Sequence, residues 1–86
     1  MSEQFIGEVT HYFGAPHVAA LTLTDGPLAT GDTIHVKGAT SDFTQAVASL
    51  QIEHESVDSA VVGDQIGIEV VARTRVHDKI YVVTAD

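Results

Sequence analysis

The chain has 86 residues, with twelve acidic and four basic side chains and a formal net charge of -8. This length predicts one domain over residues 1–86, with residues 1–4 frayed. A negative field repels phosphate backbones, so DNA binding is not expected. The apolar runs are too short to cross a bilayer and no leader pattern is present, so we expect a cytoplasmic protein without membrane contacts. The absence of cysteine excludes disulfides and thiolate metal sites.

Strand patterns dominate the first half of the chain. Residues 5–13 are rich in β-branched and aromatic side chains and predict a first strand, in which Gly7 marks a bulge or a close approach. Residues 18–23 alternate in the same way and predict a second strand. Residues 33–37 follow a Gly-Asp turn and predict a third.

The stretch 43–53 is ambiguous, because Ala46, Val47 and Leu50 would also suit one face of a helix. Its alternation and its lack of helix caps favour a strand, with a bulge between Val47 and Ala48. Strands at 66–71 and 79–84 complete the prediction. Six short strands favour an all-β fold, a small closed six-stranded barrel, since closure removes exposed sheet edges. The expected core consists of Val9, Leu21, Leu23, Ile34, Val36, Leu50, Ile52, Ile66, Ile68, Ile80 and Val82.

An internal repeat organises these strands. Residues 28–36 and 60–68 share an apolar residue, two spacers, Gly-Asp, one spacer, Ile, one spacer and a β-branched residue. Gly31 and Gly63 suit a turn that needs positive φ, and Asp32 and Asp64 suit its carboxylate cap. Each copy therefore predicts a turn that begins a strand.

Several segments carry a family resemblance. They include Gly-Asp-Thr-Ile-His-Val-Lys-Gly at 31–38, Ser-Leu-Gln-Ile-Glu-His at 49–54 and Gly-Asp-Gln-Ile-Gly-Ile at 63–68. The chain resembles the small stand-alone proteins called translation elongation factor-like, and the C-terminal barrel domain of collagenase-like peptidases. More distantly, its Gly-Asp turns resemble domain 2 of elongation factor Tu. The resemblance covers nearly the whole chain and implies a barrel of the elongation factor domain 2 type.

For function, the resemblance implies a docking module rather than an enzyme. The chain lacks a phosphate-binding Gly-x-x-x-x-Gly-Lys-Ser/Thr loop, and the peptidases carry any catalysis outside the barrel. We therefore expect a non-catalytic, translation-associated binding module without a cofactor, which docks RNA or a translation factor or ribosomal partner. The alternative is an accessory barrel subunit that docks on a collagenase-like peptidase homologue. The acidic composition favours a protein partner over RNA.

Cationic side chains gather in one short window. Arg73, Arg75 and Lys79 flank His77, and Lys37 is the remaining cation. Such a cluster suits recognition of phosphate or carboxylate groups, and we predict it as the docking site. In the alternative interpretation, these cations only balance nearby acids such as Glu69 and Asp78.

Aromatic side chains at strand ends offer a second candidate surface. Tyr12, Phe13 and Phe43 lie beside glycines and could form an apolar patch for a protein partner. In the alternative interpretation, Phe13 and Phe43 fill the two ends of the barrel.

Metal binding and catalysis receive little support from the pattern. No histidine pair has the short spacing of a metal site among His11, His17, His35, His54 and His77. His11 with Ser49 or Ser56 lacks the Gly-x-Ser-x-Gly context of a nucleophile. Glu53 and Glu55 are interpreted as a solvated face. We therefore predict no metal ligands and no catalytic residues.

Overall fold

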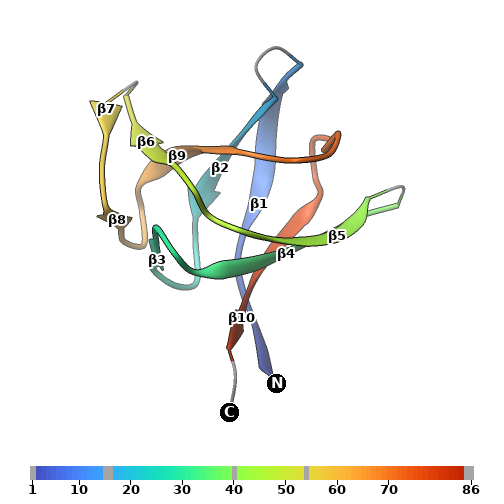
Figure 1. Cartoon of the computed structure of the whole chain (residues 1–86), viewed down its shortest axis with the longest axis horizontal. Coiled ribbons are helices and arrows are strands. Elements are labelled where there is room, and N and C mark those ends of the chain that lie inside the picture. The colour runs from blue at the N-terminus through green and yellow to red at the C-terminus, as the bar shows by residue number, and fades with distance from the viewer. Residues whose placement is uncertain (1, 15–16, 40, 54, 85–86) are drawn as a thin grey trace.

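The computed structural model describes residues 2–14, 17–39, 41–53 and 55–84, and their regular structure is entirely β (Figure 1). None of these residues forms a helix that could span a membrane. The strands are β1 Ser2–Phe13, β2 Val18–Leu23, β3 Leu28–Ala29, β4 Thr33–Lys37, β5 Asp42–Ala46, β6 Leu50–Ile52, β7 Glu55–Ser56, β8 Ser59–Ala60, β9 Gln65–Glu69 and β10 Lys79–Thr84.

Eight of the strands form one antiparallel sheet in the order β5-β4-β10-β1-β2-β9-β6-β7, and β3 pairs with β8 in a second sheet. The all-β prediction is confirmed, whereas the closed six-stranded barrel is wrong. The strand predicted at 43–53 is interrupted, so that β5 pairs with β4 and β6 pairs with β9. Because these two parts meet through the covalent chain rather than through a ladder, the large sheet stays open.

Three predicted strands have the observed bounds, namely β2, β4 and β10. Residues 2–4 of the segment expected to be frayed belong to β1, where Ser2 pairs with Thr84 and Gln4 pairs with Val82 of β10. Met1 lies outside the described residues. This pairing holds the first and last strands side by side (Figure 1).

The core lies between the inward faces of the curved sheet and contains nine of the predicted residues. Ile52 and Val82 are only partly buried against it. The pattern missed six buried hydrophobic residues: Ile6, Ala19, Leu28, Val47, Ala60 and Val70. Several of these lie outside regular strand alternation, where a period of two cannot reveal burial.

Gly7 lies at the bulge predicted for β1. The register between β1 and β10 shifts between Phe5 and Gly7, which leaves Ile6 as the extra residue. The carbonyl of Ile6 accepts hydrogen bonds from the amides of Thr24 and Asp25 at 2.8 and 3.2 Å. The bulge therefore anchors the chain that leaves β2.

Both predicted Gly-Asp turns are confirmed. Gly31 and Gly63 have φ angles of 91° and 98°. An Asp32 carboxylate oxygen accepts the amide of Ala29 at 3.0 Å, and Asp64 accepts that of Val61 at 2.9 Å. The carboxylates therefore cap the turns as expected.

A third turn of the same kind precedes β10, and the sequence pattern does not reveal it. Asp78 accepts the amide of Arg75 at 2.9 Å, and the amide of Asp78 donates to the carbonyl of Arg75 at 3.1 Å. His77 stands where the other copies have glycine, with a φ of 78°. The Gly-Asp pattern does not include this copy, because a histidine adopts the left-handed conformation there.

Replacing His77 tests the strain at this position. Both His77→Gly and His77→Ala remove the 2.6 Å hydrogen bond between the imidazole and Glu8. Only glycine relaxes the positive φ, so we expect His77→Gly to be more stable than His77→Ala by about 1 kcal/mol. Urea denaturation of the two variants measures the difference, and equal stabilities would contradict a strained backbone.

The side chain of Gln45 connects β5 to the chain that leaves β9. Its amide nitrogen donates to the carbonyl of Glu69 at 2.8 Å, and its amide oxygen accepts from the amide of Val71 at 2.8 Å. A carboxamide thus takes the place of a backbone peptide group across the open edge of the sheet.

Gln45→Ala should therefore destabilise the fold. The substitution leaves the peptide groups of Glu69 and Val71 without these partners, and we expect a loss of about 1 to 2 kcal/mol. Urea denaturation measures this loss. Gln65→Ala, also on a strand but exposed, serves as the control and should change stability by less than about 0.5 kcal/mol.

Candidate functional site

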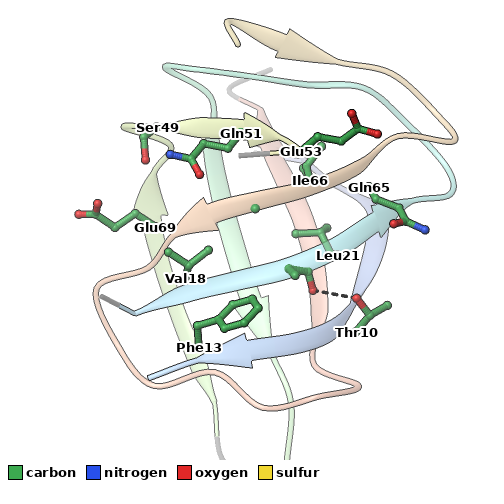
Figure 2. A pocket seen from close by; sticks show the side chains of 12 residues that line it. Thr10, Phe13, Val18, Leu21, Ser49, Gln51, Glu53, Gln65, Ile66 and Glu69 are labelled. Carbon is green, nitrogen blue, oxygen red and sulfur yellow. Dashed lines mark hydrogen bonds between the residues drawn. The ribbon is translucent and has the colours of Figure 1, made fainter. Parts of the chain in front are cut away.

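A groove of about 540 Å³ lies over the outer face of β1, β2, β9 and β6 (Figure 2). Register explains its floor, because Ala20 pairs with Gly67, and Gly67 pairs with Gln51. Two residues from Ala20 along β2, Val18 pairs with Phe13 of β1, so the neighbouring row across the strands has larger side chains. Two small residues side by side therefore leave a hollow beside a row of larger side chains.

Charge in the groove has one sign. Glu53 and Glu69 line it, and neither lysine nor arginine contributes to the lining. Figure 2 shows the two carboxylates on different sides of the opening. The groove therefore combines an apolar floor with an acidic rim.

The predicted cationic residues lie around the turn before β10. Lys37 and Lys79 are direct partners across β4 and β10, and Arg75 begins the turn. Arg73 lines a smaller hollow of about 450 Å³ with Tyr12 and other residues. That this cluster docks a partner stays a prediction.

These cations do not balance the acids suggested by the sequence. Within the described part of the chain, the ion pairs all involve histidine, and none involves lysine or arginine. Asp78 bonds the backbone of Arg75 rather than its guanidinium. None of the four basic side chains therefore forms an ion pair with another described residue.

The predicted aromatic residues lie in different surroundings. Phe13 is 48% exposed and lines the groove. Tyr12 lines the smaller hollow, where its hydroxyl lies 2.7 Å from the Nδ1 atom of His17. Phe43 packs against the core from β5. Phe13 therefore does not fill an end of the sheet, and its exposed ring belongs to the groove.

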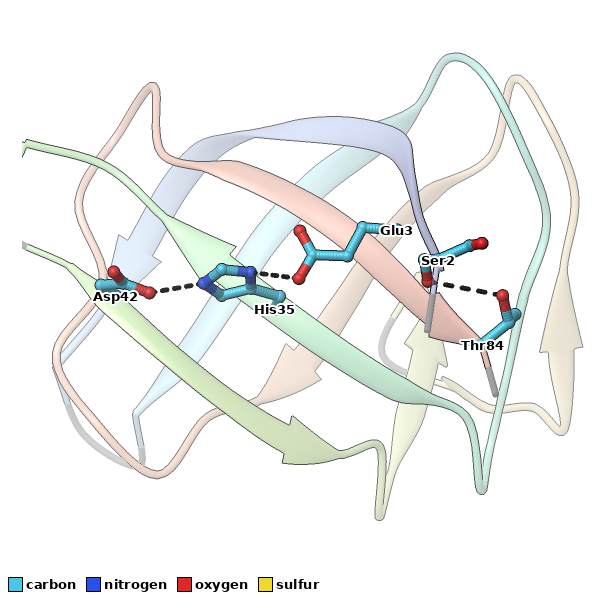
Figure 3. A network of polar contacts seen from close by, with 5 residues as sticks. All are labelled: Ser2, Glu3, His35, Asp42 and Thr84. Carbon is cyan, nitrogen blue, oxygen red and sulfur yellow. Dashed lines mark hydrogen bonds and ion pairs between the residues drawn. The ribbon is translucent and has the colours of Figure 1, made fainter. Parts of the chain in front are cut away.

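His35 forms a polar network that the sequence did not reveal (Figure 3). Its Nδ1 atom lies 2.8 Å from a Glu3 oxygen, and its Nε2 atom lies 2.5 Å from an Asp42 oxygen. The hydrogen bond to Asp42 raises the pKa of His35 above 6.5, burial opposes this, and Glu3 raises it further. The imidazolium thus links β1, β4 and β5.

This network predicts a pH dependence of stability. Because the folded pKa lies above the unfolded value of 6.5, the stabilisation is fully present below pH 6.5. It is lost as the pH rises from 6.5 through the folded pKa. Urea denaturation across this window should show falling stability, and His35→Gln should flatten that slope. An unchanged slope in the variant would contradict the assignment to His35.

The other histidines that the structure describes do not assemble with His35. His77 bonds Glu8, and the ring of His11 lies 4.4 Å from that of Phe13, centre to centre. His54 lies outside the described residues. Among the residues described, no group of three or more histidine, aspartate or glutamate side chains has an arrangement that would hold a metal ion.

No protein-family model matches the chain. A collagenase of Porphyromonas gingivalis is 32% identical over 78 residues, which make up 90% of this chain and 22% of that protein. An uncharacterized protease of Methanocaldococcus jannaschii is 32% identical over 79 residues, 91% of this chain and 19% of that protein. The chain thus spans about a fifth of the length of these relatives.

Solved structures match over nearly the whole chain. The C-terminal domain of a U32 peptidase from Geobacillus thermoleovorans has a TM-score of 0.86 at 18% identity, covering 94% of this chain and 93% of that one. The selenomethionine variant of that domain has a TM-score of 0.83 at 19% identity, covering 90% and 96%. The fold is that of a U32 peptidase C-terminal domain.

These comparisons correct the functional prediction. Proteins similar to this chain over most of its length include a collagenase, a protease and a peptidase domain. The resemblance to collagenase-like peptidases is confirmed, whereas the resemblance to translation elongation factors receives no support. The predicted translation-associated module is therefore wrong.

Proposed function

We propose that this protein is a non-catalytic β-domain that docks on the body of a collagenase-like peptidase. The proposal rests on how much of each similar protein this chain matches. The chain matches nearly the whole of a U32 peptidase C-terminal domain, yet spans about a fifth of the length of its curated relatives. Most of each relative therefore lies outside the matched segment, where a catalytic body can be accommodated.

The proposal assigns the docking contact to the cationic cluster Lys37, Arg73, Arg75 and Lys79. These side chains lie near the turn before β10 and form no ion pair within the described chain. Unpaired cations on a protein of net charge -8 provide a local attraction for carboxylates that the rest of the surface would repel.

A reconstituted complex tests this function. The body of the Porphyromonas gingivalis collagenase, with its matching 78-residue segment deleted, is titrated with the chain by calorimetry. We expect binding in the micromolar range, about -8 kcal/mol. The intact collagenase serves as the control and should bind weakly, because its own segment occupies the site.

Two further measurements sharpen the test. Arg73→Ala combined with Arg75→Ala should weaken binding at least tenfold, about 1.4 kcal/mol, whereas Glu55→Ala on β7 should not. The chain alone should leave gelatin intact. Cleavage of gelatin by the chain alone, or no binding to the truncated body, would refute the proposal.

A further inference from the structure

We propose that the groove over β1, β2, β9 and β6 binds a peptide segment of a partner in which an apolar side chain stands between basic residues. This inference goes beyond docking on a peptidase body, because it concerns a different surface from the cationic cluster. A volume of about 540 Å³ lies within the usual range of ligand pockets, about 300 to 1,000 Å³.

The three turn-and-strand repeats explain why the hollow exists. In each repeat one outward residue stands between two apolar residues of the following strand: His35 in β4, Gly67 in β9 and Tyr81 in β10. The rings of His35 and Tyr81 lie 6.2 Å apart, centre to centre, and cover their part of the sheet. Gly67 has no side chain, so the outer face of β9 stays uncovered.

The wall beside this hollow offers an apolar contact. Phe13 pairs with Val18, which pairs with Glu69 in the next strand. Phe13 is 48% exposed, so its ring can gain contact area when a ligand side chain enters. An aliphatic or aromatic side chain over Gly67 would pack against this ring and against Ala20.

The two carboxylates on the rim favour a positively charged ligand. Glu53 and Glu69 are exposed on different sides of the opening, and among the residues that the structure describes no basic side chain lines the groove (Figure 2). Acidic ligands and phosphate groups would be repelled there. A segment with lysine or arginine on either side of its apolar residue would complement both carboxylates.

Amide groups on the rim favour a peptide over another cationic amphiphile. Gln51 and Gln65 line the groove, and neither carboxamide forms a hydrogen bond within the described chain. Each offers donors and an acceptor to a passing peptide group. The groove therefore supplies all three kinds of contact that such a segment needs: apolar, ionic and amide.

Titration of the isotope-labelled chain with two blocked peptides tests the inference. The first is Gly-Arg-Leu-Phe-Lys-Gly, and the second replaces Arg and Lys with Glu. We expect amide shifts at groove residues with the basic peptide, at a Kd of about 100 μM. The acidic peptide should bind at least tenfold more weakly. Equal affinities, or shifts confined to other surfaces, would refute the proposal.

Variants of the groove separate it from the rest of the surface. Gly67→Tyr places over β9 the same side chain that the third repeat carries as Tyr81. It should fill the groove and weaken peptide binding at least tenfold. The Cβ atom of the new tyrosine would lie 3.2 Å from Val18, so this variant alone does not separate a filled groove from a disturbed fold. The charge-reversed pair Glu53→Lys with Glu69→Lys is therefore a second variant, and it should weaken binding similarly. Glu55→Lys, outside the lining, is the control for a single charge reversal away from the groove.

The outcomes do not depend on the peptidase proposal, because no peptidase body is present. Binding that survives both groove variants would refute the groove as the site, even if the collagenase body binds the chain. Loss of binding in both variants but not in Glu55→Lys would establish the groove, even if docking on the peptidase body fails.

Discussion

Gly38→Ala is expected to lower the free energy of unfolding by about 2 to 3 kcal/mol. A Cβ atom at this position would overlap with the carboxylate of Asp78. Asp78 as a whole is 4% exposed, and its carboxylate caps the turn before β10 by accepting the amide of Arg75. The alanine must therefore displace a buried cap or push β4 away from β10.

Thermal and urea denaturation measure this loss. For a domain of this size, each kcal/mol corresponds to a change in Tm of roughly 4 to 8 °C. Gly14→Ala provides the control, because its Cβ atom would meet nothing within 4 Å. The control should stay within about 0.5 kcal/mol of the wild type.

A double-mutant cycle identifies the clash as the cause. In an Asp78→Ala background the obstructing carboxylate is gone, so Gly38→Ala should then cost less than about 1 kcal/mol. Equal costs in the two backgrounds would show that Gly38 is needed for another reason.

Gly7→Ala is expected to cost about 3 kcal/mol, the second large effect. Its Cβ atom would lie 2.5 Å from the carbonyl oxygen of Thr22 and 3.1 Å from a methyl group of Leu21. The carbonyl belongs to the backbone of β2, so the contact is relieved only when β1 and β2 separate or the bulge changes. Stopped-flow and equilibrium urea denaturation measure the loss.

Ala20 provides a matched test of the same sheet. It lies on β2, where its side chain is only partly buried, so Ala20→Gly removes a methyl group without adding a clash. We expect this variant to cost about 1 kcal/mol or less. A Gly7→Ala variant no less stable than Ala20→Gly would contradict the close approach of Gly7 to β2.

The sequence predicted the elements whose causes are local. The Gly-Asp turns at 31–32 and 63–64 were predictable because glycine accepts a positive φ and aspartate caps the adjacent amide. The bounds of β2, β4 and β10 followed from alternation between turn residues. The all-β class followed from the same signals.

The third turn shows where a local pattern fails. His77 takes the position of glycine because contacts with distant residues hold it there: its amide donates to the carbonyl of Val9 at 2.8 Å and its ring bonds Glu8. No pattern within residues 74–82 contains those partners. The open sheet likewise depends on the pairing of β5 with β4 and of β6 with β9. A prediction of one continuous strand over residues 43–53 cannot show that its two halves pair with different strands.

By itself, then, the sequence determined the strand-forming segments, two capped turns, most of the core and the acidic charge of this protein. The tertiary structure alone decided the groove, because its floor joins Ala20, Gly67 and Gln51 from three strands. It also decided the network around His35, whose partners Glu3 and Asp42 come from β1 and β5. The physical reason is that local conformation depends on neighbours in the chain, whereas a surface is made by register between strands distant in sequence.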